Sequence, residues 1–446
     1  MPDSAPDQTA ASRLPRALRP FGVREYRLLA VALGSSLFGG GVWIIAIVGT
    51  VFALDGTPGD LSLVATGTAV GMLVAALFGG AAADRIPQRR ILLTVEIART
   101  VAIAAVAALA LTGRLELWHL AVGGVVLGLA EGAFYPAYSA LLPRVLPADQ
   151  LLAANGVEGM LRPIASQAAG PAVASLAILL GGPGLAFLII GLTQLLAIGC
   201  LAAMRGAPLD RASATGGAVR GFVADIGGGI RTVVGTPWLI ATLLYASVVI
   251  LLVVGPFDVL VPFAVRDQAG GGEAAFALVL AMYGVGGAVG SFVVASLRLP
   301  RRYLTVMNVV WTLGCLPMAV FGLVEHVWVF VVLAFVMGLC GDSANVLWGT
   351  ILQRRVPKDM LGRVSSLDFF VSVSLLPVSM ALAGPVADLV GLGPVFLVAG
   401  LAPVVLAVVA ILAARMHVDE LAHPLDDDRI EPDAQEILGP GAPIHG

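Results

Sequence analysis

Long apolar segments alternate with short polar ones along almost the whole chain. Each apolar segment is about 20 residues long, which is the length at which an α-helix crosses a bilayer. The alternating apolar and polar residues of membrane β-strands are missing, so the pattern predicts helices. We therefore expect an all-α membrane protein with about twelve transmembrane helices. The predicted helices span 28–54, 61–83, 91–112, 118–140, 151–180, 185–204, 237–263, 275–297, 304–324, 327–350, 363–390 and 394–415.

The connections between these segments differ in charge in a regular way. Arginines gather in every second connection, whereas the others contain only Arg114 and Arg266. Positive residues stay on the cytoplasmic side of a membrane protein, so both termini are expected there. The predicted division is a cytoplasmic N-terminal segment (1–27), a six-helix bundle (28–204), a cytoplasmic linker (205–236), a second six-helix bundle (237–415) and a disordered, acidic cytoplasmic tail (416–446).

The two predicted bundles resemble each other in sequence. Gly128-Leu129 and Pro147-Ala148-Asp149 in the first bundle have counterparts, at one constant offset, in Gly338-Leu339 and Pro357-Lys358-Asp359 of the second. Parallel repeats of this kind, joined by a long loop, are the layout of one large class of secondary transporters.

The composition agrees with a membrane protein and excludes several functions. Of the 446 residues, 58% are hydrophobic and only 12% are charged, against about 25% charged in soluble proteins. The only lysine, Lys358, follows Val356-Pro357, so the chain lacks the phosphate-binding loop of an ATP-driven pump. Its three cysteines show no metal or disulfide spacing, and its first twenty residues lack the apolar core of a signal peptide.

The connection after the second predicted helix carries a recognisable motif. It reads Gly-Ala-Ala-Ala-Asp-Arg-Ile-Pro-Gln-Arg-Arg over residues 80–90. This resembles the signature loop of the major facilitator superfamily, G-x-x-x-D-R-x-G-x-R-R, with Pro87 in place of the second glycine. The resemblance implies a latch that joins the two halves in one state and breaks in the other, with the aspartate facing its own arginines or the positive N-terminus of the eleventh helix. The predicted latch residues are Gly80, Asp84, Arg85, Arg89 and Arg90.

Two further stretches resemble exporters of that superfamily. Gly170-Pro171 resembles their Gly-Pro motif, and Gly384-Pro385 is its counterpart in the second bundle. Such a pair predicts a helix bend and, for the fifth helix, close packing on a helix of the other half. Residues 134–155 are similar to the branch that contains the enterobactin exporter and related multidrug efflux proteins. Membership would imply a cavity between the halves that opens alternately to each side.

Ionisable side chains inside the spans are costly and are therefore functional candidates. Glu96 and Arg99, like Glu158 and Arg162, are spaced to share one helix face, so each pair can be a structural ion pair or part of a network. Glu131 has no basic partner on its own helix, and Asp342 lies at nearly the equivalent place in the second bundle. The predicted proton-coupling and substrate-cavity residues are Glu131, Asp342, Glu158, Arg162, Arg99 and Glu96.

Two other carboxylates receive simpler interpretations. Asp258 is expected to be a solvated charge at the rim of the seventh helix, and Asp368 a carboxylate near a helix start. Asp342 can also be a packing residue that bonds its neighbours.

These features favour a secondary transporter, a proton-coupled exporter of drugs, siderophores or other small amphiphilic metabolites. The alternatives are a membrane-embedded enzyme acting on a lipid-like substrate, an importer, or a non-transporting sensor. No catalytic residue, metal or cofactor is expected. The expected energy source is a proton gradient. The expected partners are a small-molecule substrate and membrane lipid, without nucleic acid, and the chain is expected to be a monomer in a bacterial inner membrane.

Overall fold

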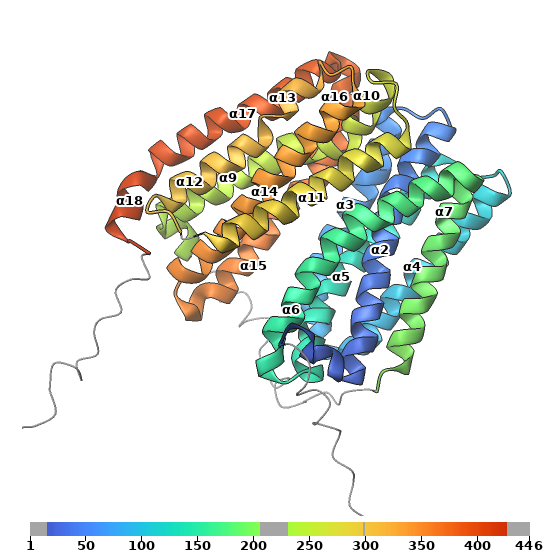
Figure 1. Ribbon diagram of the computed structural model, residues 1–446, viewed down its shortest axis with the longest axis horizontal. Coiled ribbons are helices and arrows are strands. Elements are labelled where there is room, and N and C mark those ends of the chain that lie inside the picture. The colour runs from blue at the N-terminus through green and yellow to red at the C-terminus, as the bar shows by residue number, and fades with distance from the viewer. Residues whose placement is uncertain (1–15, 206–230, 298, 426–446) are drawn as a thin grey trace, which may run out of the picture.

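The computed structural model of the chain describes residues 16–205, 231–297 and 299–425. The side chains of residues 16, 17, 76–85, 148, 149, 152, 156, 295, 358–363 and 366 lie outside this description. All regular elements of the described residues are helices. Figure 1 shows them as two bundles, one blue to green and one yellow to red. The predicted all-α architecture is therefore confirmed.

The first bundle follows a short 3-10 helix, η1 (Arg16–Gly22). Residues 153–203 form one apolar stretch of 51 residues, which at ~1.5 Å per residue is far longer than a bilayer core of ~30 Å. The stretch bends at Gly182, whose φ of 71° is accessible to glycine at little cost. It therefore contains two spans, as predicted. The elements are α2 (Arg24–Ala53), α3 (Pro58–Arg85), α4 (Gln88–Leu111), α5 (Leu117–Val145), α6 (Ala148–Arg162), the π-helical turn η2 (Pro163–Ala169) and α7 (Gly170–Ala203).

The second bundle has six further spans, several of them interrupted. Breaks occur at Pro256, Pro317 and Pro377, because proline has no backbone N–H to continue a helix. Among the described residues, eleven helical stretches are long and apolar enough to cross a membrane. Since one of them is the bent double span, the prediction of about twelve helices is confirmed. The elements are α9 (Pro237–Gly255), the π-helical turn η4 (Pro256–Leu260), α10 (Val261–Asp267), α11 (Glu273–Ser296), α12 (Tyr303–Cys315), α13 (Met318–Phe321), α14 (Val327–Arg355), α15 (Lys358–Ser374), α16 (Leu376–Val390) and α17 (Leu392–Ala413).

The same glycine contact holds corresponding helices together in the two bundles. Gly128 of α5 lies directly against the backbone carbonyl of Thr68 in α3, and Gly338 of α14 lies in the same way against that of Tyr283 in α11. A Cβ at either glycine would overlap the facing carbonyl oxygen. In a bilayer such close approach of small residues drives helix association. The repeat seen in the sequence is thus a repeated helix–helix crossing.

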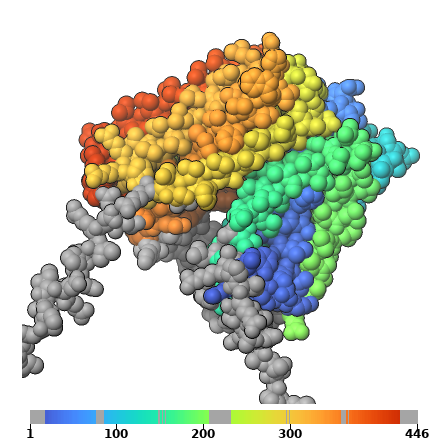
Figure 2. Space-filling view, in the orientation of Figure 1, coloured from blue at the N-terminus to red at the C-terminus, as the bar shows by residue number. Residues whose placement is uncertain are grey.

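The two bundles meet at one end of the molecule and separate toward the other. We call the end with the α2–α3 and α10–α11 connections the distal end, and the end where α2 begins the proximal end. At the distal end α3 packs on α16, and Phe52 of α2 contacts Phe263 of α10 edge to face, with ring centroids 5.3 Å apart. Figure 2 shows the bundles touching along the upper edge and diverging below, where an opening separates them. The proximal side of the interface is therefore open.

The prediction of a disordered tail from residue 416 is wrong for its first residues. A further helix, α18 (Met416–Ala422), packs on the proximal ends of α12 and α17. The residues look polar in sequence, but Met416 and Glu420 lie one turn apart and both are fully buried. Residues 426–446 of the predicted tail and residues 206–230 of the predicted linker lie outside the described residues.

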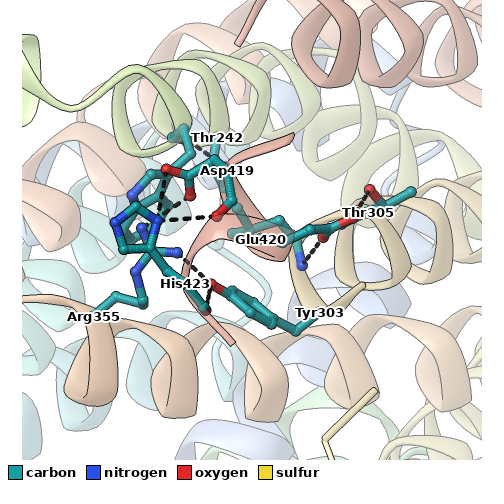
Figure 3. Close-up of polar contacts among 9 residues, drawn as sticks. Thr242, Tyr303, Thr305, Arg355, Asp419, Glu420 and His423 are labelled. Carbon is teal, nitrogen blue, oxygen red and sulfur yellow. Dashed lines mark hydrogen bonds and ion pairs between the residues drawn. The ribbon is translucent and has the colours of Figure 1, made fainter. Parts of the chain in front are cut away.

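Glu420 supplies the N-terminal cap that α12 lacks in its own sequence. It accepts hydrogen bonds from the backbone N–H groups of Leu304 and Thr305, at 3.0 and 3.1 Å, and from the Thr305 hydroxyl at 2.8 Å. Beside it Arg355 of α14 pairs with Asp419 at 2.9 Å (Figure 3). A carboxylate at a helix N-terminus satisfies unpaired donors and the helix dipole. Helix α18 therefore contacts the start of α12 and the ends of α14 and α17.

Glu420→Ala should destabilise the folded protein by about 1–3 kcal/mol, because two buried N–H groups lose their acceptor. The measurement is the thermal midpoint of the purified protein in detergent. Glu420→Gln, which keeps one acceptor oxygen, should lose less. His417→Ala, an exposed position of the same helix, is the matched control. Equal midpoints for Glu420→Ala and His417→Ala would contradict the capping role.

Candidate functional site

Three ionisable side chains of the first bundle form one ion-paired network. Arg99 of α4 pairs with Glu131 of α5 at 2.6 Å and with Glu96 one turn earlier on α4 at 3.3 Å. Ser36 of α2 donates a hydrogen bond to Glu96 at 2.7 Å and itself accepts one from Arg99. Glu131, which has no partner on its own helix, is therefore paired across the α4–α5 interface.

The members of this network differ in their access to solvent. Glu96 is fully buried and Arg99 nearly so, whereas 47% of the Glu131 side chain is exposed. Two carboxylates share a single guanidinium, so the network carries one excess negative charge when both are ionised. One oxygen of Glu96, Oε2, accepts no hydrogen bond from the described residues. Two carboxylates thus share one arginine, and Glu131 is the exposed member of the network.

The second predicted pair lies apart from this network. Arg162 of α6 bonds to Glu158 at 3.1 Å and stacks over the ring of Tyr135, its guanidinium carbon 5.4 Å from the ring centre. Together these groups line a cavity of about 520 Å³ that also includes Asn155. Tyr135 follows Glu131 by one turn of α5, so the two clusters adjoin on that helix. The charged groups of the first bundle thus form two separate clusters.

The carboxylates of the second bundle have different surroundings. Asp342 accepts a weak hydrogen bond from Asn345 at 3.4 Å, and Asp368 accepts one from the indole N–H of Trp348 at 3.1 Å. Among the described residues no arginine, lysine or histidine forms an ion pair with these two aspartates or with Asp258. Asp368 and Asn345 line a cavity of about 550 Å³ between α9, α11, α12, α14 and α15.

One interpretation from sequence is wrong here. Asp368 is not a helix-start carboxylate, because α15 begins at Lys358 and carries Asp368 into the cavity wall. Asp258 is exposed, as expected of a solvated charge, and it belongs to the π-helical turn η4. A turn of this kind is often found at functional sites. The Pro256 that opens it was the available signal in the sequence.

The described part of the predicted latch has a structural partner in its own bundle. Arg89 donates hydrogen bonds to the carbonyls of Leu201 and Ala202 at the end of α7, at 2.7 and 2.6 Å. This caps the C-terminus of the sixth span with a positive charge. Arg90 is exposed. The side chains of Gly80, Asp84 and Arg85 lie outside the described residues, and the latch stays a prediction.

The two Gly-Pro motifs have different neighbours. A Cβ at Gly170 would lie 2.8 Å from the Cα of Gly41, so the glycine of this motif packs on α2 of its own bundle, while α7 and η2 pack on α11 of the other half as expected. It is Gln167, one turn earlier, that lies against Gly284 of α11. Gly384-Pro385 does join the halves, because Gly384 lies against Gly59 of α3.

Gly384 is part of a polar seam that closes the distal end. Its backbone N–H donates to the hydroxyl of buried Ser62 on α3 at 3.0 Å, and the Ser62 hydroxyl donates to the carbonyl of Met380 on α16. These bonds cross between the two bundles. The Ser62 hydroxyl forms hydrogen bonds with two backbone groups at once. Directional hydrogen bonds as well as close packing therefore hold α3 and α16 together.

Gly384→Ala should weaken the closed distal end. The added Cβ would lie 2.7 Å from Cα of Gly59 and from the carbonyl oxygen of Pro58, so α3 and α16 must move apart. We expect a cysteine placed in the cavity to be labelled faster from the distal side by a membrane-impermeant thiol reagent. Gly393→Ala is the control, since a Cβ there meets no atom within 4 Å. Equal labelling of both variants would contradict the seam.

Comparisons with known proteins agree with this geometry. The family model described as "Transmembrane secretion effector" matches residues 16–436. The chain is 30% identical over 396 residues to the multidrug efflux pump Tap of Mycolicibacterium fortuitum, covering 86% of this chain and 94% of that protein. It is 22% identical to macrolide efflux protein A of Streptococcus pyogenes over 76% of this chain and 84% of that protein.

Solved structures show the same fold at low sequence identity. The nucleoside transporter NupG superposes with a TM-score of 0.67 at 10% identity, over 87% of this chain and 98% of that one. A bacterial homologue of the lysosomal transporter Spinster, crystallised in an inward-facing state, superposes with a TM-score of 0.62 at 15% identity, over 89% and 98%. Bundles, repeat and sequence matches all lead to one assignment: the chain belongs to the transmembrane secretion effector family of the major facilitator superfamily.

Proposed function

We propose that this protein exports small amphiphilic molecules, drugs among them, from the cytoplasm in exchange for protons. Support for export comes from the relatives named as multidrug and macrolide efflux proteins. Support for alternating access comes from the closed distal seam and the open proximal side. The arginine-rich connections lie at the proximal end, so the positive-inside rule assigns that end to the cytoplasm. The described conformation is then the inward-facing one.

The network of Glu96, Arg99 and Glu131 is the proposed proton site, and the observation that carries the proposal is the shared guanidinium. In the ionised network, Glu131 holds Arg99 at 2.6 Å. A proton on Glu131 removes its charge and weakens that bond, while Glu96 and Ser36 keep Arg99 neutralised and in place. Because the α4–α5 pair then loosens, protonation changes the packing of two helices of the first bundle. Proton release restores it.

The substrate is proposed to bind in the opening between the bundles. Candidate binding groups are the aromatic rings and carboxylates of the cavity in the second bundle, and the tyrosines with the Glu158–Arg162 pair of the cavity in the first. Largely apolar cavities with a few placed polar groups bind drug-sized molecules. The predicted latch around Asp84 is proposed to hold the proximal end closed in the outward-facing state.

The test is transport by the purified protein in sealed vesicles. A pH difference of one unit is worth about 1.4 kcal/mol per proton, which sustains about a tenfold substrate gradient for one-to-one exchange. We expect ethidium to move against its gradient when the pH difference is imposed, and to stop when a proton ionophore collapses it. Movement that ignores the ionophore would overturn proton coupling, and no movement of ethidium would overturn the proposed export.

A further inference from the structure

Among the described residues of the second bundle, three carboxylates within the spans have no basic partner. Asp258, Asp342 and Asp368 lie within its spans, whereas its arginines and its lysine lie in connections or close to helix ends. In the first bundle, by contrast, Arg99 and Arg162 neutralise the carboxylates around them. Uncompensated charge in a membrane protein interior is expensive, so it requires a proton or a cationic partner.

The cavity in this bundle has the chemistry that recognises an organic cation. Trp348 donates its indole N–H to one oxygen of Asp368, which fixes that carboxylate at the cavity wall beside Phe369. Trp311 and Tyr283 supply two further aromatic rings on the wall. An aromatic ring attracts a cation held against its face, and the attraction grows when water is excluded. The volume of about 550 Å³ lies in the range that holds a drug-sized molecule.

Asp342 adds a second carboxylate next to this cavity. Gly287 of α11 has no side chain, so Asp342 of α14 lies directly against its backbone. Asn345, on the cavity wall, bonds to Asp342 and connects it to the cavity. Asp342 and Asp368 therefore both place a carboxylate at or next to this cavity.

Building on the proposed function, we propose that this cavity is a binding site for organic cations, in which Asp368 and Asp342 supply the counter-charge and Trp348 and Phe369 the aromatic faces. The proton site and the substrate site are then in different bundles. Proton uptake by the arginine-paired carboxylates of the first bundle and cation capture by the unpaired carboxylates of the second use separate groups. An amphiphile with a delocalised or quaternary positive charge is the ligand that fits both the rings and the carboxylates.

Equilibrium binding of tetraphenylphosphonium to the purified protein, in detergent and without any gradient, tests the site. Tetraphenylborate has nearly the same shape and the opposite charge, so it is the matched probe. We expect the protein to bind the cation and not the anion. Asp368→Asn should weaken cation binding about tenfold, since it removes one buried partner of the charge. Asp342→Asn should weaken it by a smaller factor, and the double variant by more than either.

Two further variants separate binding from folding. Asp368→Glu keeps the charge and should retain most of the affinity, whereas Trp348→Leu should lose affinity with Asp368 in place. Glu325→Gln removes an exposed carboxylate between α13 and α14 and should bind like the parent. Variants are compared only where the thermal midpoint matches that of the parent.

The outcomes for this site and for transport are distinct. Failure of the parent to bind tetraphenylphosphonium, equal binding of the anion, or unchanged affinity in both Asp368→Asn and the double variant would overturn the cation site and leave proton-driven export standing. Selective cation binding that depends on Asp368, together with vesicles that show no proton-driven flux, would keep the site and overturn the proposed function.

Discussion

Gly338→Ala is expected to prevent the second bundle from folding. The new Cβ would overlap the carbonyl oxygen of Tyr283, and both partners are helix backbone, so neither can rotate away. Helices α11 and α14 would have to separate along their whole crossing. Overpacking a core costs about 1–3 kcal/mol where side chains can adjust, and here we expect at least about 3 kcal/mol. Packing of small residues is a main source of helix association in lipid, so little else would compensate.

The yield of monodisperse protein in detergent, together with its thermal midpoint, measures this effect. Gly349→Ala is the matched control, because it lies on the same helix and a Cβ there meets no atom within 4 Å. Gly128→Ala should fail like Gly338→Ala, since it meets Thr68 in the equivalent crossing of the first bundle. Normal yield and midpoint for Gly338→Ala would show that the two helices are not packed this closely.

The positions of the spans could be predicted because apolar length alone determines what crosses a bilayer. The repeat could be predicted because glycines such as Gly128 and Gly338 stand at the same offset in both halves. Pairs within one helix, such as Glu158 with Arg162, follow from helical spacing and are present in the structure.

The rotation of each helix about its axis could not be predicted. Most spans are apolar all round, so the sequence gives no face that must turn inward. For this reason the sequence does not determine which arginine pairs with Glu131, nor that Gly170 itself lies against Gly41. The docking of α18 was missed for a related reason, since one buried turn in a polar segment leaves almost no pattern in the sequence.

Glu131→Gln is expected to abolish transport driven by a pH gradient while leaving the fold intact. Glutamine resembles protonated glutamate, so the network stays in its protonated form and has no proton to release. The remaining pair, Glu96 with Arg99, is neutral and keeps its bond to Ser36, so no buried charge is left without a partner. In vesicles the gradient sustained by a pH difference of one unit should fall from about tenfold to one.

Exchange of labelled for unlabelled substrate, measured without a pH difference, separates coupling from binding. This exchange needs only the alternating opening of the cavity, so Glu131→Gln should retain it.

Glu96→Gln leaves the exposed Glu131 as the only carboxylate bound to Arg99. This variant should reduce stability as well as transport, because breaking a buried ion pair is costly. Glu325→Gln controls for the loss of one carboxylate at an exposed site. Undiminished proton-driven transport by Glu131→Gln would mean that the exchanged proton is carried elsewhere, and the carboxylates of the second bundle would then have to carry it.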